Sequence, residues 1–274
     1  MSEQTIDTGT SHLLYCIRDG VAILTLNRPE ARNALSAEIG VALPAMIKRS
    51  LEDPEVGALL LTGAGTAFCA GGDVKGMGDK RKNAEQPMEE RLRLMRERHR
   101  AVTGALVLSP KPTIAALPGP AAGAGLSLAM ACDMRIAAAS AFVSTGYAKI
   151  GLSGDYGIAW LLSRAIGDAR ARELLLTCER VPVARAEQLG LINRVVADAD
   201  LHAEAFALAR SLANGPRLTL RNIKANLDDA RAQDYLSAID GEALRVVQSS
   251  QTDDHKEAVR AFMEKRAPQF RDRF

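Results

Sequence analysis

Two short segments consist almost entirely of residues with small side chains, and such segments leave backbone N–H groups accessible. The first reads AFCAGGD (residues 67–73) and the second reads PGPAAGAGL (residues 118–126). The second precedes a predicted helix, so its N–H groups would lie at a helix N-terminus, where the helix dipole favours negative charge. The pattern is therefore suited to holding a negatively charged group. Tight turns with close backbone packing are an alternative for either segment alone.

Other motifs that carry chemistry are missing from the sequence. Neither segment has the glycine pattern of a phosphate-binding loop or of a dinucleotide-binding fold, and there is no G-x-S-x-G elbow. The four cysteines (Cys16, Cys69, Cys132 and Cys178) are scattered, with no C-x-x-C and no histidine at ligand spacing. They predict free thiols in a reducing compartment, and no metal site.

The two segments lie within alternating strand and helix patterns, which predict an α/β fold. Expected strands span residues 13–17, 21–26, 56–62, 113–117, 134–138 and 192–196, and expected helices span residues 37–51, 79–108, 126–132, 157–166 and 169–176. Asp19-Gly20 between the first two strands predicts a hairpin. From residue 200 only helices are expected, at 200–213, 216–230, 234–249 and 254–266. We therefore divide the chain into a flexible tail (1–12), an α/β core (13–199) and a helical C-terminal region (200–274).

Composition excludes several classes of protein. The 274 residues carry 35 Lys and Arg against 33 Asp and Glu, a net charge of +2 that argues against nucleic acid as a partner. No run approaches the ~18 apolar residues of a membrane span, and the N-terminus has no apolar signal region. These features predict a cytoplasmic protein without membrane contact.

Taken together, the two segments resemble the signatures of the enoyl-CoA hydratase/isomerase (crotonase) family. AFCAGGD is similar to the family's aFcaGaD, and ALPGPAAGAGLSLAMACD is similar to its a.nG.a.GgG..la.acD. The flanks LTLNRPEARNALS, ARELLLTCERVPVARAEQLGLINRVV and KEAVRAFMEKRAPQF agree, so the resemblance covers residues 13–274. It implies a spiral of ββα turns, a C-terminal helical region that packs trimers or hexamers, a coenzyme A thioester as substrate, and no permanently bound cofactor.

The resemblance also implies site residues. In the family, one backbone N–H from each small-residue segment forms an oxyanion hole for the thioester oxygen, and the corresponding donors here are Ala70 and Ala124. Further substrate or coenzyme A contacts are implied at Arg28, Arg32, Gly71, Gly72, Asp73, Gly123, Ser127, Tyr147 and Lys265. Lys265 is expected to reach the coenzyme A of a neighbouring subunit. A plain surface charge is the alternative for each of the three basic residues.

The acid/base residues depart from the hydratase pattern. Hydratases of the family use two glutamates, and the corresponding positions are Ser127 and Tyr147, neither of which is a carboxylate. Asp155, in GLSGDYG, corresponds to the catalytic Asp of some family isomerases and of members acting on aryl-CoA, although it could instead cap the next helix. A single base favours moving a double bond over adding water. Hydration by other residues and acyl-CoA binding without catalysis are alternatives. His99 is expected to be an exposed helical residue, and a place in the lining of the acyl channel is the alternative.

Overall fold

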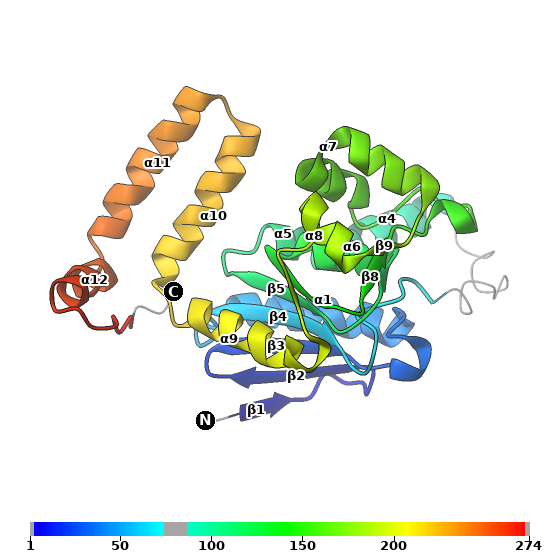
Figure 1. Ribbon diagram of the computed structural model, residues 1–274, viewed down its shortest axis with the longest axis horizontal. Helices are drawn as coiled ribbons and strands as arrows, with labels where there is room; N and C mark the ends of the chain where they lie inside the picture. Colours follow the sequence, from blue (N-terminus) through cyan, green and yellow to red (C-terminus); the bar gives the residue numbers. More distant parts are fainter. Residues whose placement is uncertain (1–2, 74–86, 272–274) are drawn as a thin grey trace.

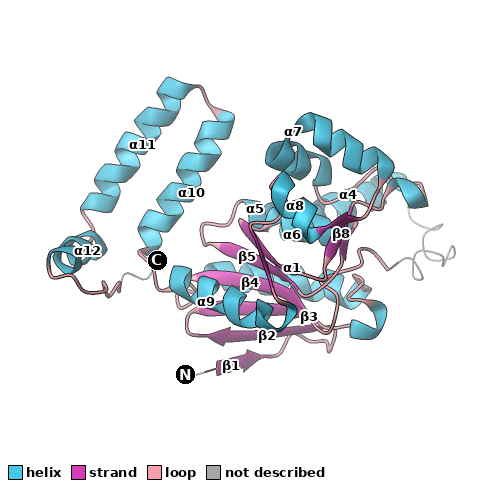
Figure 2. Cartoon of the chain, viewed as in Figure 1, coloured by secondary structure: helices cyan, strands magenta, loops and turns pink. Residues whose placement is uncertain are grey.

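The computed structural model describes residues 3–73 and 87–271. These residues form a central sheet with helices on both faces, followed by a helical arm (Figures 1 and 2). The strands are β1 (Glu3–Ile6), β2 (Leu13–Arg18), β3 (Val21–Leu26), β4 (Ala58–Gly63), β5 (Thr113–Leu117), β6 (Ala121–Ala122), β7 (Met134–Ala138), β8 (Phe142–Ser144), β9 (Val181–Pro182) and β10 (Arg194–Val196). The α-helices are α1 (Ala37–Glu52), α4 (Met88–His99), α5 (Ala105–Val107), α6 (Ala124–Ala131), α7 (Ile158–Thr177), α8 (Val183–Leu189), α9 (Leu201–Ala213), α10 (Arg217–Ala232), α11 (Tyr235–Ser250) and α12 (Asp253–Met263).

The large sheet has the strand order β1-β2-β3-β4-β5-β7-β10. β2 and β3 form the expected hairpin, and its turn residues Asp19 and Gly20 both have positive φ (50° and 80°), as this turn type requires. The segment expected to be a flexible tail contributes a strand instead. β1 pairs antiparallel with the open edge of β2, so the backbone groups of that edge obtain partners.

The sheet itself brings the two small-residue segments together. β3, β4, β5, β7 and β10 run parallel, and β4 and β5 are direct neighbours. Residues 67–73 follow β4 and residues 118–126 follow β5. Because parallel strands end at the same edge of a sheet, both segments start side by side. A second sheet, β6-β8-β9, was not expected, because its strands of two or three residues are too short for a periodic pattern.

The helices largely follow the sequence patterns. Ser36 caps α1 by accepting a hydrogen bond from Ile39 N, and Pro44 lies inside the helix. The two helices expected at 157–166 and 169–176 merge into α7, with a non-helical backbone at Gly167. The helix expected from Asp79 is described only from Met88, and a π-helical segment (Arg100–Gly104) separates α4 from α5.

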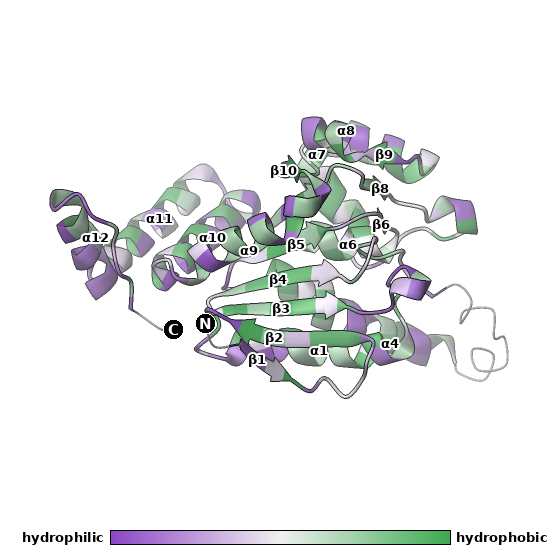
Figure 3. Cartoon of the chain, turned by 60° about the horizontal axis from the view of Figure 1, so that its bottom comes forward, coloured by the Kyte–Doolittle hydropathy of each residue, from purple (hydrophilic) through white to green (hydrophobic). Residues whose placement is uncertain are grey.

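Two hydrophobic clusters cover the two faces of the sheet, whose strands β2–β4 carry apolar side chains (Figure 3). On one face, α9 packs its buried residues Ala205, Ala209 and Ala213 against β3, β4, β5 and β7. α9 therefore belongs to the core, and the helical arm that leaves the core consists of α10, α11 and α12 (Figure 1). Within the described residues no helix is long and apolar enough to cross a membrane.

Candidate active site

The two small-residue segments run against each other with their backbones in contact. Cys69 pairs with Ala121 in a parallel bridge, and Ala122 N donates to Cys69 O at 2.9 Å. A Cβ on Gly125 would lie 2.2 Å from Cys69 O, and a Cβ on Gly71 would lie 2.9 Å from Ala122 O. The small residues are thus required for close packing, and this packing also sets the directions of the N–H groups.

The prediction that Ala70 supplies a free donor is wrong. Ala70 N donates to Arg32 O at 2.9 Å, so its N–H is already used. Two peptides further along, in the peptide between Gly71 and Gly72, Gly71 O accepts a hydrogen bond from Leu35 N at 2.8 Å. A trans peptide places its N–H opposite its C=O, so the N–H of Gly72 points away from residues 32–35. It has no backbone acceptor among the described residues.

Gly71 allows the chain to turn so that the N–H groups of Ala70 and Gly72 have different surroundings. Its φ of 98° belongs to the region that favours glycine, so the chain can turn here and direct Gly72 N–H away from residues 32–35. A Cβ on Gly71 would lie 3.5 Å from Ala124 N, which shows how near the two segments are. The N–H of the first segment that lacks a backbone acceptor is therefore that of Gly72, a residue for which the sequence predicts only substrate contact.

Ala124 is positioned by the start of a helix. It is the first residue of α6, two residues before the predicted start, and the preceding Gly123 has φ of 52°. Gly123 O accepts from Ser127 N at 3.1 Å along the helix, so Ala124 N–H, in the same peptide as that carbonyl, points out of the helix N-terminus. The N–H groups of Gly72 and Ala124 thus come from adjacent segments.

One turn along α6, three side chains singled out from the sequence meet. Tyr147 OH donates to Asp155 Oδ1 at 2.6 Å, and Ser127 Oγ lies 2.9 Å from Tyr147 OH and 3.3 Å from the backbone O of Asp155. A Cβ on Gly123 would lie 4.0 Å from Tyr147 Cε1, so the cluster borders the second segment. Asp155 does not cap α7, because the N-cap is Gly157 and has no side-chain hydrogen bond.

The cluster keeps a partly buried carboxylate next to the two N–H groups. Burial raises the pKa of Asp155, while the hydrogen bond from Tyr147 and the charge of His99 oppose that rise. Burial and the negative charge of Asp155 both raise the pKa of Tyr147. The phenol therefore stays protonated and donates a hydrogen bond to the carboxylate. Asp155 is therefore a carboxylate with a raised pKa whose orientation is set by the Tyr147 phenol.

His99 is less exposed than its helical pattern predicts. It is half-buried, and its ring packs on that of Tyr156 with centroids 4.3 Å apart and an interplanar angle of 42°. The sequence does contain a sign that His99 is partly buried. It lies four residues after Met95 and three before the buried Val102, so the three residues share one face of a helix.

The basic residues expected near coenzyme A differ in their surroundings. Arg28 Nη1 donates to Asp73 Oδ2 at 3.0 Å and to Ala34 O at 2.8 Å, so Arg28 braces the end of the first segment. The side chain of Arg32 is exposed, and so is that of Lys265, which lies two residues after the end of α12. Contact of these residues with coenzyme A stays a prediction.

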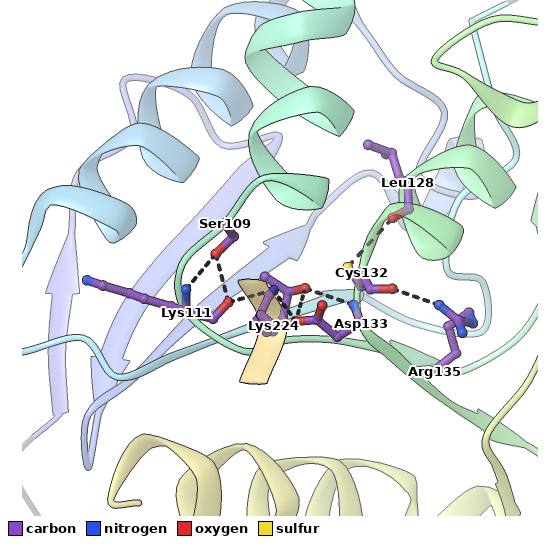
Figure 4. A network of polar contacts seen from close by, with 8 residues as sticks. Ser109, Lys111, Leu128, Cys132, Asp133, Arg135 and Lys224 are labelled. Carbon is purple, nitrogen blue, oxygen red and sulfur yellow. Dashed lines mark hydrogen bonds and ion pairs between the residues drawn. The ribbon is translucent and has the colours of Figure 1, made fainter. Parts of the chain in front are cut away.

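Asp133, at the end of the second family signature, has a structural role (Figure 4). Its Oδ2 accepts from Thr113 N at 2.8 Å, from Thr113 Oγ1 at 3.0 Å and from Lys224 Nζ at 2.6 Å. Lys224 Nζ also donates to Lys111 O at 3.2 Å. The carboxylate therefore ties α10 of the arm to β5 and β7.

We expect Asp133→Ala to lower the free energy of unfolding by about 1 kcal/mol, because Lys224 and the N–H of Thr113 lose an acceptor that is partly screened by solvent. Denaturant unfolding at neutral pH measures the change. Asp228→Ala, at an exposed position on α10, is the matched control. Equal stability of the two variants would contradict the role.

The described part of the chain holds no cluster of His, Cys, Asp or Glu that could bind a metal ion, and its four cysteines are free.

Comparison with known proteins identifies the family to which the chain belongs. The family model for enoyl-CoA hydratase/isomerase matches residues 17–273. The 1,2-epoxyphenylacetyl-CoA isomerase of Escherichia coli is 36% identical over 94% of this chain and 97% of its own. Crystal structures of enoyl-CoA hydratases from Polaromonas and Mycobacterium smegmatis superpose with TM-scores of 0.87 and 0.84, at 34% and 35% identity, over 94% of this chain and 99% and 98% of theirs. The chain belongs to the enoyl-CoA hydratase/isomerase family and has the crotonase fold.

Proposed function

We propose that the chain is an enoyl-CoA isomerase that moves a double bond along the acyl chain of a coenzyme A thioester. The observation that carries the proposal is Asp155, a carboxylate oriented by Tyr147 in a cluster that borders the second small-residue segment. The thioester oxygen accepts hydrogen bonds from Gly72 and Ala124, which lowers the energy of an enolate. The 1,2-epoxyphenylacetyl-CoA isomerase of Escherichia coli shows that the relatives of this chain include an isomerase named for a coenzyme A thioester.

The reaction needs one base and one oxyanion site. Asp155 removes a proton from C2 of a 3-enoyl thioester; the C–H electron pair moves into the conjugated system, and negative charge collects on the thioester oxygen. The protonated Asp155 then returns a proton to C4, the double bond becomes 2-enoyl, and the carboxylate is restored. Ser127 and Tyr147 occupy the positions of the hydratase glutamates, and they hold Asp155 rather than a water molecule.

The proposal is tested by incubating the purified protein with matched 2-enoyl-CoA and 3-enoyl-CoA substrates. We expect interconversion, seen as a change in ultraviolet absorbance, with no change in mass. A gain of the mass of one water would show a hydratase that uses other residues. Tight binding without any turnover across a panel of acyl groups would show a binding protein.

We further propose that the arm assembles the protein into a trimer or a dimer of trimers. Large apolar side chains on α10, α11 and α12 are exposed in the single chain, among them Leu227, Leu244, Phe262 and Met263. Exposed apolar clusters of this kind are typical of protein interfaces. In such an assembly, Lys265 would be available to the coenzyme A of a neighbouring subunit.

Phe262 is 82% exposed in the single chain, so its replacement is a direct test of assembly. We expect Phe262→Glu to convert the assembly to smaller species, because a charge would be buried in an apolar contact. Light scattering coupled to size exclusion gives the mass. Lys256→Glu, on the same helix, is the control for added charge. A wild-type protein that runs as a monomer would rule the assembly out.

A further inference from the structure

We infer that His99 relays protons between Asp155 and solvent, so that the hydrogen returned to the acyl chain comes from water. This inference rests on the proposed function, because it concerns the proton held by Asp155 during the reaction. It adds a second titratable group to a site in which the mechanism above uses one.

The position of His99 supports the relay. Its ring packs on Tyr156, the residue that directly follows Asp155, with centroids 4.3 Å apart. Tyr156 is buried, and its φ of 49° is unusual for a residue with a side chain, so the contact is held by a constrained backbone. His99 itself is half-buried. One side of the imidazole therefore faces the Asp155 loop while the ring keeps contact with solvent.

The helix that carries His99 is also unusual at this point. The π-helical segment Arg100–Gly104 begins immediately after His99, and Thr103 Oγ1 donates to His99 O at 3.1 Å. Single-turn π-helical segments within α-helices are frequent at functional sites. The chain continues as helix through this segment into α5, so His99 does not lie at a free helix end.

The charges around the pair suit proton transfer. The groups that face His99 are Asp155 and Tyr156 from the 151–157 loop and Arg98 from its own helix, and Cys69 of the first small-residue segment acts on Tyr156. Burial lowers the pKa of His99, although the charge of Asp155 opposes this, and burial raises the pKa of Asp155. These shifts bring the two pKa values toward each other, so a proton moves between the groups with a smaller change in free energy.

The relay replaces the proton taken from C2 with a proton from water. After Asp155 takes the C2 proton, His99 accepts that proton from the carboxyl group and releases it to water. His99 then takes a proton from water and passes it to Asp155, which delivers it to C4. Without His99, the original hydrogen stays on Asp155 and returns to the same substrate molecule. The net isomerisation is identical in both cases, and only the origin of the hydrogen differs.

The test is isomerisation of a 3-enoyl-CoA in D₂O, with the deuterium content of the product measured by mass spectrometry during initial turnover. We expect the wild-type product to carry deuterium from solvent. For His99→Gln we expect deuterium per turnover to fall about tenfold or more, on the scale of a general acid–base contribution, with a smaller loss in the rate of isomerisation. Added imidazole is expected to restore incorporation. His255→Gln, on α12, is the matched control.

A second measurement does not depend on isomerisation. Exchange of the C2 protons of a saturated acyl-CoA into D₂O requires only the base, the oxyanion site and access to solvent protons. Exchange that is lost in His99→Gln, in a wild-type protein that does not isomerise, would support the relay and reject the proposed function. Wild-type incorporation in a folded His99→Gln variant, in either reaction, would overturn the relay.

Discussion

Asp155→Asn is expected to lower the rate of isomerisation by about 10²–10⁴-fold, the contribution of a well-placed general base. The amide cannot accept a proton at neutral pH, but it retains an oxygen that can accept the hydrogen bond of Tyr147. Steady-state kinetics with a 3-enoyl-CoA measures kcat and KM separately, and we expect the loss in kcat. Asp168→Asn, at an exposed position of α7, is the control. Full activity of Asp155→Asn would remove Asp155 from the mechanism.

The pH dependence follows from the environment of Asp155. The base acts as a carboxylate, and burial raises its pKa, so kcat/KM for the wild type should fall as pH decreases through a value above that of an ordinary Asp. The folded state binds this proton more tightly than the unfolded state, so the charged carboxylate costs stability above its folded-state pKa. Asp155→Asn should therefore have a higher Tm than the wild type at neutral pH, and the difference should shrink in acid.

Loss of one backbone donor is expected to lower kcat by about 10²–10³-fold. Gly71→Ala tests the first segment, because a side chain disfavours φ of 98° and its Cβ would lie 2.9 Å from Ala122 O. The peptide that directs Gly72 N–H would then turn. Gly9→Ala is the control, because Gly9 also has positive φ (75°) and a Cβ there meets nothing within 4 Å.

Ala124→Pro removes the second donor itself. Proline is accepted at the first position of a helix, where the N–H has no intrahelical partner. We expect a loss in kcat of similar size to that of Gly71→Ala, with a normal unfolding transition for each variant used in the comparison. Wild-type kcat in both folded variants would mean that the thioester oxygen is held elsewhere.

Much of the fold follows from local patterns in the sequence. Asp19-Gly20 specifies a hairpin turn by its backbone preferences, Ser36 caps its helix, and the alternation of strands and helices predicts an α/β fold. The short strands β6, β8 and β9 and the pairing of β1 with β2 are not predicted, because they depend on partners that are distant or at a sheet edge. Local propensity carries no information about such partners.

The candidate site divides in the same way. The sequence by itself determined the two small-residue segments, the lack of the hydratase glutamates at Ser127 and Tyr147, and the candidate base Asp155. Only the tertiary structure decided which N–H is free, because the direction of each peptide depends on the hydrogen-bond partner across from it. Arg32 O accepts the N–H of Ala70, and Leu35 N donates to Gly71 O, which directs the N–H of Gly72 away from residues 32–35. The tertiary structure also decided the surroundings of His99. A helical pattern in the sequence does not reveal which of its side chains will pack against a distant loop, as His99 does against Tyr156.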